Sequence, residues 1–102
     1  MRPVAELRYA DFALCAADEI INQAAKVRYM LGGQVRVPMV IRQPIGMRWG
    51  MAAQHSQSNE NLWVGTAGLV VVASATPADN HGLLKAAIRC DDPVVFMESE
   101  VM

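Results

Sequence analysis

The sequence predicts an α/β fold in which helices cover a mostly parallel sheet. Short apolar runs alternate with segments whose apolar residues recur at helical spacing. This alternation is typical of parallel sheets, because consecutive parallel strands are joined by crossovers that usually contain a helix. The chain has 102 residues, a suitable length for one domain. We therefore expect a single domain over residues 1–102 with right-handed crossovers.

The first predicted strand covers residues 4–7, and a helix is expected to follow it. Asp11 is a favourable N-cap for that helix, because its carboxylate can accept a free backbone N–H of the first turn. The apolar residues expected along one helix face are Phe12, Ala16, Ile20, Ala24 and Val27. Gly32 and Gly33 predict the helix end, since glycine readily adopts the left-handed conformation found there.

The second predicted strand covers residues 37–42. Its residues alternate little between apolar and polar types, which predicts that both faces of the strand are covered. Pro44 and Gly46 are expected to end it, because both residues interrupt regular structure. Residues 47–57 are then expected to form a loop or short helix, and residues 62–64 a short turn.

Residues 69–72 carry the strongest strand signal, because they are continuous and mostly β-branched. The sequence Thr76-Pro77-Ala78-Asp79 has the capping-box pattern with proline at the first helical position, and it predicts the start of a second helix. The residues expected on the buried face of this helix are Leu83, Leu84, Ala87 and Ile88. The run Asp91-Asp92-Pro93 predicts the end of this helix. The last strand is predicted over residues 94–97.

Charge and cysteine content exclude several classes of protein. The net charge is −1, with nine basic and ten acidic residues and no basic patch, which disfavours binding to nucleic acid or to a membrane surface. The longest apolar run, residues 67–75, is far too short to span a bilayer. Cys15 and Cys90 lie far apart without metal-ligand spacing. We expect a reduced, cytoplasmic protein without disulfides or zinc.

The main candidate for a functional segment is the polar loop Ala52-Ala53-Gln54-His55-Ser56-Gln57, which contains one of the two histidines. It follows the second predicted strand, and open α/β sheets bind their ligands in loops at the carboxyl ends of strands. His55 is therefore a candidate ligand-contacting residue. A structural or solvent-exposed imidazole is the alternative, and the residues of this loop by themselves leave both interpretations open.

Several motifs occur in one register from Arg2 to Glu98. They include Arg2-Pro3-Val4-Ala5-Glu6-Leu7, Ala10-Asp11-Phe12, Ala52-Ala53-Gln54-His55-Ser56-Gln57 and Gly68-Leu69-Val70-Val71-Val72, together with residues 18–26, 28–30, 38–42, 82–84, 87–89 and 92–96. In these motifs the chain resembles the β subunit of thiamine-diphosphate-dependent 2-oxo acid dehydrogenases, the pyruvate, branched-chain and acetoin dehydrogenase group. The resemblance implies a truncated pyrimidine-binding domain of the transketolase type.

The resemblance also implies a cofactor and a set of site residues. In this family the β subunit binds the aminopyrimidine of thiamine diphosphate, and a partner α subunit holds the diphosphate and magnesium. Phe12 matches the aromatic residue that packs on the pyrimidine, and His55 matches the active-site histidine. Arg8 stands where the family usually has a methionine beside the pyrimidine. The residues that match a backbone-carbonyl site for a monovalent cation in some members are Met39, Ala87, Cys90 and Asp92.

The chain also departs from the family pattern. The family's catalytic glutamate matches a position upstream of Arg2, and no Gly-Asp-Gly motif with a downstream asparagine occurs. Arg48 and Trp49 make the loop before His55 bulkier than its family counterpart, which favours a rearranged, non-catalytic site. We therefore expect part of a β subunit that is not catalytically competent alone. The alternatives left open are a non-catalytic module that docks on a partner or on itself, and a remnant without selected activity.

A homo-oligomer is expected in addition to the possible α-subunit partner. A domain lacking flanking elements of its family would expose apolar faces of the size found at protein interfaces. The edges of a parallel sheet would also stay unpaired. A two-fold symmetric dimer is the default arrangement for such an assembly.

Overall fold

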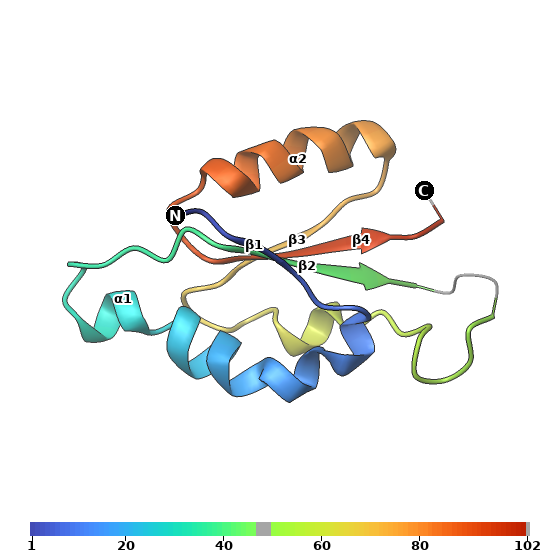
Figure 1. Cartoon of the computed structure of the whole chain (residues 1–102), viewed down its shortest axis with the longest axis horizontal. Helices are drawn as coiled ribbons and strands as arrows, with labels where there is room; N and C mark the ends of the chain where they lie inside the picture. The colour runs from blue at the N-terminus through green and yellow to red at the C-terminus, as the bar shows by residue number, and fades with distance from the viewer. Residues whose placement is uncertain (47–49, 102) are drawn as a thin grey trace.

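The computed structural model describes residues 1–46 and 50–101. Within them, β1 (Val4–Glu6), β2 (Val40–Ile45), β3 (Val70–Ala73) and β4 (Val94–Ser99) form one sheet in the order β1-β2-β4-β3, and every pair of neighbours is parallel. Helix α2 (Pro77–Arg89) covers one face, and a helical run that starts at Ala10 covers the other (Figure 1). The predicted α/β fold with a parallel sheet is confirmed.

The helix predicted after β1 is a run of three helical types. It comprises η1 (Ala10–Ala16) with 3₁₀ geometry, η2 (Glu19–Ala24) with π geometry and the α-helical turn α1 (Val27–Met30). Because the number of residues per turn changes along the run, its buried residues do not follow the regular predicted stripe. They are Ala10, Ala13, Ile20 and Ala25, whereas Phe12 is 40% exposed. The predicted glycine stop is confirmed, since the N–H of Gly33 bonds to the carbonyl of Arg28 at 2.8 Å.

The prediction that Asp11 caps this helix is wrong. The helical run begins two residues earlier than predicted, at Ala10, with Tyr9 at the N-cap position and no side-chain cap. The Asp11 carboxylate instead accepts the backbone N–H of Gln57 at 3.3 Å. A tertiary contact to the loop after β2 has therefore replaced the local hydrogen bond that the sequence favours.

Pro44 does not end the second strand as predicted. Strand β2 starts at Val40, later than expected, and continues to Ile45, with Pro44 opposite Glu98 of β4. The backbone N–H of Val40 and the carbonyl of Arg42 bond to the β1 side, so the nitrogen of Pro44, two residues further along, also faces that side. Because β1 has ended at Glu6, the missing N–H of Pro44 loses no ladder hydrogen bond.

Helix α2 begins as the sequence predicts. Thr76 Oγ1 accepts the N–H of Asp79 at 3.1 Å, and Pro77 is the first helical residue. The α2 side chains that pack on the sheet are Leu84, Ala87 and Ile88, against Val40, Val94 and Phe96. Leu83 was expected on this buried face but is 41% exposed, because it lies about 100° around the helix from Leu84. The strongest strand prediction, β3, forms an edge of the sheet.

The connection between β2 and β3 lies on the same face as η1. Its short helical turn η3 (Glu60–Leu62) positions Trp63, which is fully buried in one cluster with Ile41, Val95 and Met97. Both faces of β2 are therefore covered, as predicted, and both faces of the neighbouring β4 are covered as well. In the described part of the chain, no helix has the length and apolar character needed to cross a membrane.

Candidate functional site

The described part of the polar loop folds back from the carboxyl end of β2 onto the start of η1. The N–H of Gly46 bonds to the carbonyl of Gln57 at 3.1 Å, which closes the base of the loop. The N–H of Gln57 bonds to the Asp11 carboxylate, which fastens the loop to η1. Ala52 has a φ of 64°, a left-handed conformation that non-glycine residues adopt mainly where surrounding contacts impose it.

His55 lies between two aromatic residues at the start of the helical run. Its ring centroid is 5.2 Å from that of Tyr9 and 5.2 Å from that of Phe12, with interplanar angles of 65° and 76°. Both contacts therefore have the edge-to-face arrangement that aromatic rings prefer. The structure thus brings together Phe12 and His55, the two residues that the sequence analysis selected from distant parts of the chain.

Arg8 does not join this group of rings. Its guanidinium pairs with the Glu6 carboxylate, and Arg42 approaches the same carboxylate at 3.3 Å. The hydrogen bond from Arg8 holds the pKa of Glu6 below its ordinary value, and Glu6 raises the pKa of Arg8. A cofactor contact of Arg8 stays a prediction. Arg48 and Trp49, expected to fill space near His55, lie outside the described residues.

A polar network crosses the sheet on the α2 side, near the same carboxyl ends. Arg42 of β2 pairs with Glu98 of β4, which is only 8% exposed. Asn80 of α2 donates to the other oxygen of Glu98 at 3.2 Å and contacts Ser74 at 3.0 Å. The network ties both central strands to the first turn of α2, and it gives the buried Glu98 two partners.

The residues of the predicted cation site lie at the opposite, amino end of β4. The carbonyl of Met39 accepts the N–H of Val94 at 2.9 Å, and that of Ala87 accepts the N–H of Cys90 at 3.1 Å. The carbonyl of Cys90 accepts a 2.6 Å hydrogen bond from Arg2, and the Asp92 carboxylate pairs with Arg28. A bound monovalent cation would compete with the Arg2 guanidinium at Cys90, so this site stays a prediction. Among the described residues, no group of three or more metal-ligating side chains occurs.

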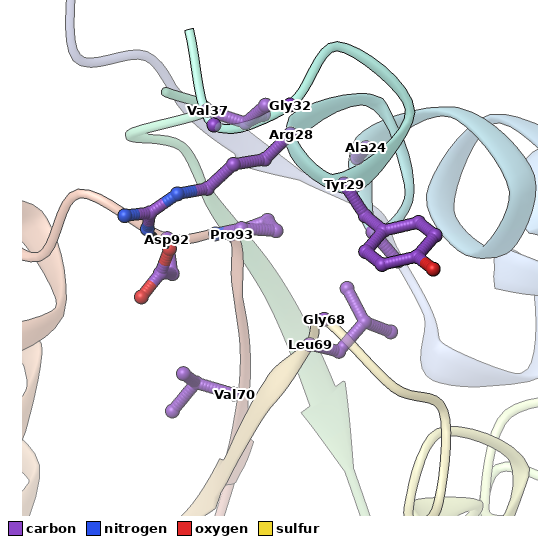
Figure 2. A pocket seen from close by; sticks show the side chains of 12 residues that line it. Ala24, Arg28, Tyr29, Gly32, Val37, Gly68, Leu69, Val70, Asp92 and Pro93 are labelled. Atoms are coloured by element: carbon purple, nitrogen blue, oxygen red, sulfur yellow. Dashed lines mark hydrogen bonds and ion pairs between the residues drawn. The ribbon is translucent and has the colours of Figure 1, made fainter. Parts of the chain in front are cut away.

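Two cavities bordered by described residues lie away from His55. One, of about 630 Å³, lies at the amino ends of β3 and β4 and is bordered by Arg28 and Tyr29 on α1 (Figure 2). The other, of about 440 Å³, separates β1 and β2 from the helical run. Their lining residues are mainly apolar and include neither His55 nor Phe12. These cavities mark places where the sheet is incompletely covered, whereas the aromatic contacts mark the candidate site.

Comparison with known protein families assigns the whole chain. The family described as transketolase, pyrimidine binding domain, matches residues 1–102. The chain belongs to this family. Its fold and its resemblance to dehydrogenase β subunits, both predicted from the sequence, are thereby confirmed.

Individual relatives of this pyrimidine-binding domain are dehydrogenase and oxidoreductase β subunits. It is 51% identical over 98 residues to the acetoin:2,6-dichlorophenolindophenol oxidoreductase subunit beta of Cupriavidus necator, covering 96% of this chain and 29% of the relative. It is 48% identical over 102 residues to the mitochondrial pyruvate dehydrogenase E1 component subunit beta of Caenorhabditis elegans, covering 100% of this chain and 29% of the relative. The 2-oxoisovalerate dehydrogenase subunit beta of Bacillus subtilis is 46% identical to it over 98 residues, covering 96% of this chain and 30% of the relative. The chain spans about three-tenths of the length of these relatives.

Sequence reasoning missed two residues that the pyrimidine-binding domain places at this site. Tyr9 contacts the imidazole of His55, and Asp11 holds the backbone of Gln57. No local signal marked Tyr9, because the helix was expected to start after Asp11, whereas Tyr9 is the extended N-cap residue of η1.

Proposed function

We propose that this domain contributes the pyrimidine-contacting residues of a thiamine diphosphate site in the β part of a 2-oxo acid or acetoin dehydrogenase. It does not catalyse the reaction alone. The observation that supports this proposal is the contact between His55 and Phe12 at the carboxyl end of the sheet. The resemblance matches both residues to site positions of the family, and this edge of open α/β sheets binds ligands.

The chemistry of the two side chains fits the cofactor. Phe12 is 40% exposed beside the imidazole, and an exposed aromatic ring suits packing against a flat heteroaromatic ring such as a pyrimidine. When bound, thiamine diphosphate supplies the carbanion-stabilising thiazolium. His55 is half-buried, and an imidazole can hold or release a proton near neutral pH. In this division of roles Phe12 binds and orients the cofactor, and His55 moves a proton.

The residues for the remaining parts of the cofactor are expected on a partner. The chain contains no Gly-Asp-Gly motif with a downstream asparagine that would hold diphosphate and magnesium. An α subunit related to those of the 2-oxo acid dehydrogenases is therefore the proposed partner. Without it, we expect the domain to bind the cofactor weakly through the pyrimidine and to show no turnover.

Titration calorimetry with thiamine diphosphate and magnesium tests this proposal. We expect saturable binding that Phe12→Ala and His55→Ala each weaken. Leu14→Ala is the matched control, because Leu14 is a 56% exposed apolar residue of the same helical segment without a ring contact to His55. The absence of saturable heat in the wild type, or equal weakening by Leu14→Ala, would contradict the proposal.

A second candidate function is a non-catalytic module that associates with itself. The observation that favours it is the exposure of three consecutive apolar residues at the end of α1, Tyr29, Met30 and Leu31. Tyr29 also borders the cavity of about 630 Å³ (Figure 2). Exposed apolar surface of this kind is typical of interfaces. Sedimentation of wild type and Tyr29→Ser/Met30→Ser, with the exposed Val64→Ser as control, separates the candidates. A wild-type monomer at all concentrations would exclude self-association.

A further inference from the structure

His55 depends on other segments for its orientation. It belongs to a loop without regular secondary structure, and its backbone N–H makes only a long contact of 3.5 Å with the carbonyl of Ala52. The imidazole makes no hydrogen bond with any other residue that the structure describes. The ring instead makes edge-to-face contacts with Tyr9 and Phe12, and these contacts restrain its orientation.

The start of η1 brings these two aromatic side chains together. Tyr9 is the N-cap residue and has an extended backbone, and Phe12 is the third residue of η1. The N–H of Phe12 bonds to the carbonyl of Tyr9 at 2.9 Å, which closes the chain into a turn between the two residues. The two rings form two walls around the imidazole of His55, which contacts each of them edge to face.

The two walls differ in how firmly they are held. Tyr9 is half-buried and is followed directly by Ala10, the first residue of η1, which is completely buried in the core. Phe12 is 40% exposed and has a surface that a ligand can cover. Tyr9 is accordingly the fixed wall, and Phe12 is the wall available to a ligand.

Asp11 supplies a second attachment for the same loop. Its carboxylate accepts the N–H of Gln57, two residues beyond His55. A hydrogen bond to a charged acceptor is stronger than one between neutral groups. It therefore restrains the backbone of the loop while the aromatic contacts restrain the imidazole.

We propose that Tyr9 is a positioning residue that sets the orientation of the His55 imidazole, with Asp11 fixing the loop that carries it. A contribution of Tyr9 to catalysis rests on the function proposed above. The positioning of the His55 imidazole by Tyr9 does not depend on that function. Phe12 is left free to contact the cofactor, and Tyr9 acts only through His55. Tyr9 is not assigned any contact with the cofactor.

Nuclear magnetic resonance of the cofactor-free chain tests the proposal. The chain has two histidines, and His81 is exposed on α2, so its signals serve as an internal reference. We expect nuclear Overhauser effects between the Tyr9 ring and the His55 ring protons in the wild type. We also expect a ring-current displacement of the His55 signals that Tyr9→Leu reduces to the part due to Phe12 and that Tyr9→Phe retains, with the His81 signals unchanged. Asp11→Ala should move the Gln57 amide signal.

Two results would overturn the proposal. One is a folded wild type without Overhauser effects from Tyr9 to His55. The other is a folded Tyr9→Leu variant whose His55 signals stay in place. If Tyr9→Leu does not fold, the Overhauser effects in the wild type and the spectrum of Tyr9→Phe still decide whether Tyr9 positions His55. Failure of the proposed function is separate, because it would appear as a lack of thiamine diphosphate binding while the His55 contacts persist.

Discussion

The indole Nε1 of Trp63 donates a 3.0 Å hydrogen bond to Oε1 of Gln43, and both side chains are completely buried. Gln43 is in the central strand β2, and Trp63 is in the connection that carries the His55 loop toward β3. Nε2 of the same Gln43 amide has no partner among the described residues. The hydrogen bond therefore satisfies one of two buried polar atoms and holds the connection under the sheet.

This pair leads to the first prediction. Trp63→Phe should destabilise the fold by about 2–3 kcal/mol, because it removes packing volume and leaves the Gln43 amide buried without a donor. Gln43→Leu alone leaves the indole N–H unpaired. The double variant should lose about 1 kcal/mol less stability than the sum of the two single losses. The reason is that neither the unpaired amide nor the unpaired indole N–H remains in it. Urea unfolding of the four proteins measures this, and strictly additive losses would contradict it.

A second prediction concerns the buried carboxylate of Glu98. Arg42→Met should destabilise the fold by about 3 kcal/mol, because it leaves a carboxylate that is 8% exposed without its cation. Arg8→Met removes the surface pair with Glu6 and should change stability little. Adding Glu98→Gln to Arg42→Met should recover part of the loss. Denaturant unfolding measures the stability of each variant. Equal losses of stability from Arg42→Met and Arg8→Met would refute the prediction.

The close approach of Gly68 to the helical run gives a third prediction. A Cβ at Gly68 would lie 1.9 Å from the carbonyl oxygen of Ala25, and its φ is +97°. Gly68→Ala should therefore cost about 3 kcal/mol or more, from backbone strain and a clash with backbone that cannot move freely. Gly65→Ala is the control, because Gly65 has a φ of +90° but open space around it. It should cost only about 1 kcal/mol. Thermal unfolding distinguishes the two variants.

A fourth prediction concerns acid stability. The hydrogen bond from Arg2, reinforced by the charge of Arg36, lowers the pKa of Asp91 below its ordinary value of 3.8. A carboxyl with a depressed folded pKa stabilises the fold above its unfolded pKa, and this contribution is lost as the pH falls through the folded value. Asp91→Asn should therefore lower Tm at neutral pH but have little effect at strongly acidic pH. Glu19→Gln, at an exposed carboxylate, is the control. An equal Tm difference at both pH values would contradict the assignment.

The sequence determined the elements whose signals are local. Thr76 and Pro77 start α2 where the capping pattern predicts, because a cap and a fixed φ need only neighbouring residues. Gly33 likewise closes the helical run through its own backbone conformation. The matched motifs also predicted Phe12 and His55 as site residues, which stays a prediction, and the fold brings their rings together.

Only the tertiary structure decided features that depend on distant neighbours. Pro44 remains in β2 because the adjoining β1 has already ended, which no local pattern reveals. Asp11 binds the loop at Gln57 instead of capping its own helix. Tyr9 and Phe12 both contact His55 because the loop after β2 folds back onto the start of η1. The physical reason is range: propensities and caps act over a few residues, whereas hydrogen-bond partners and burial at each position are settled by chain segments far away in sequence.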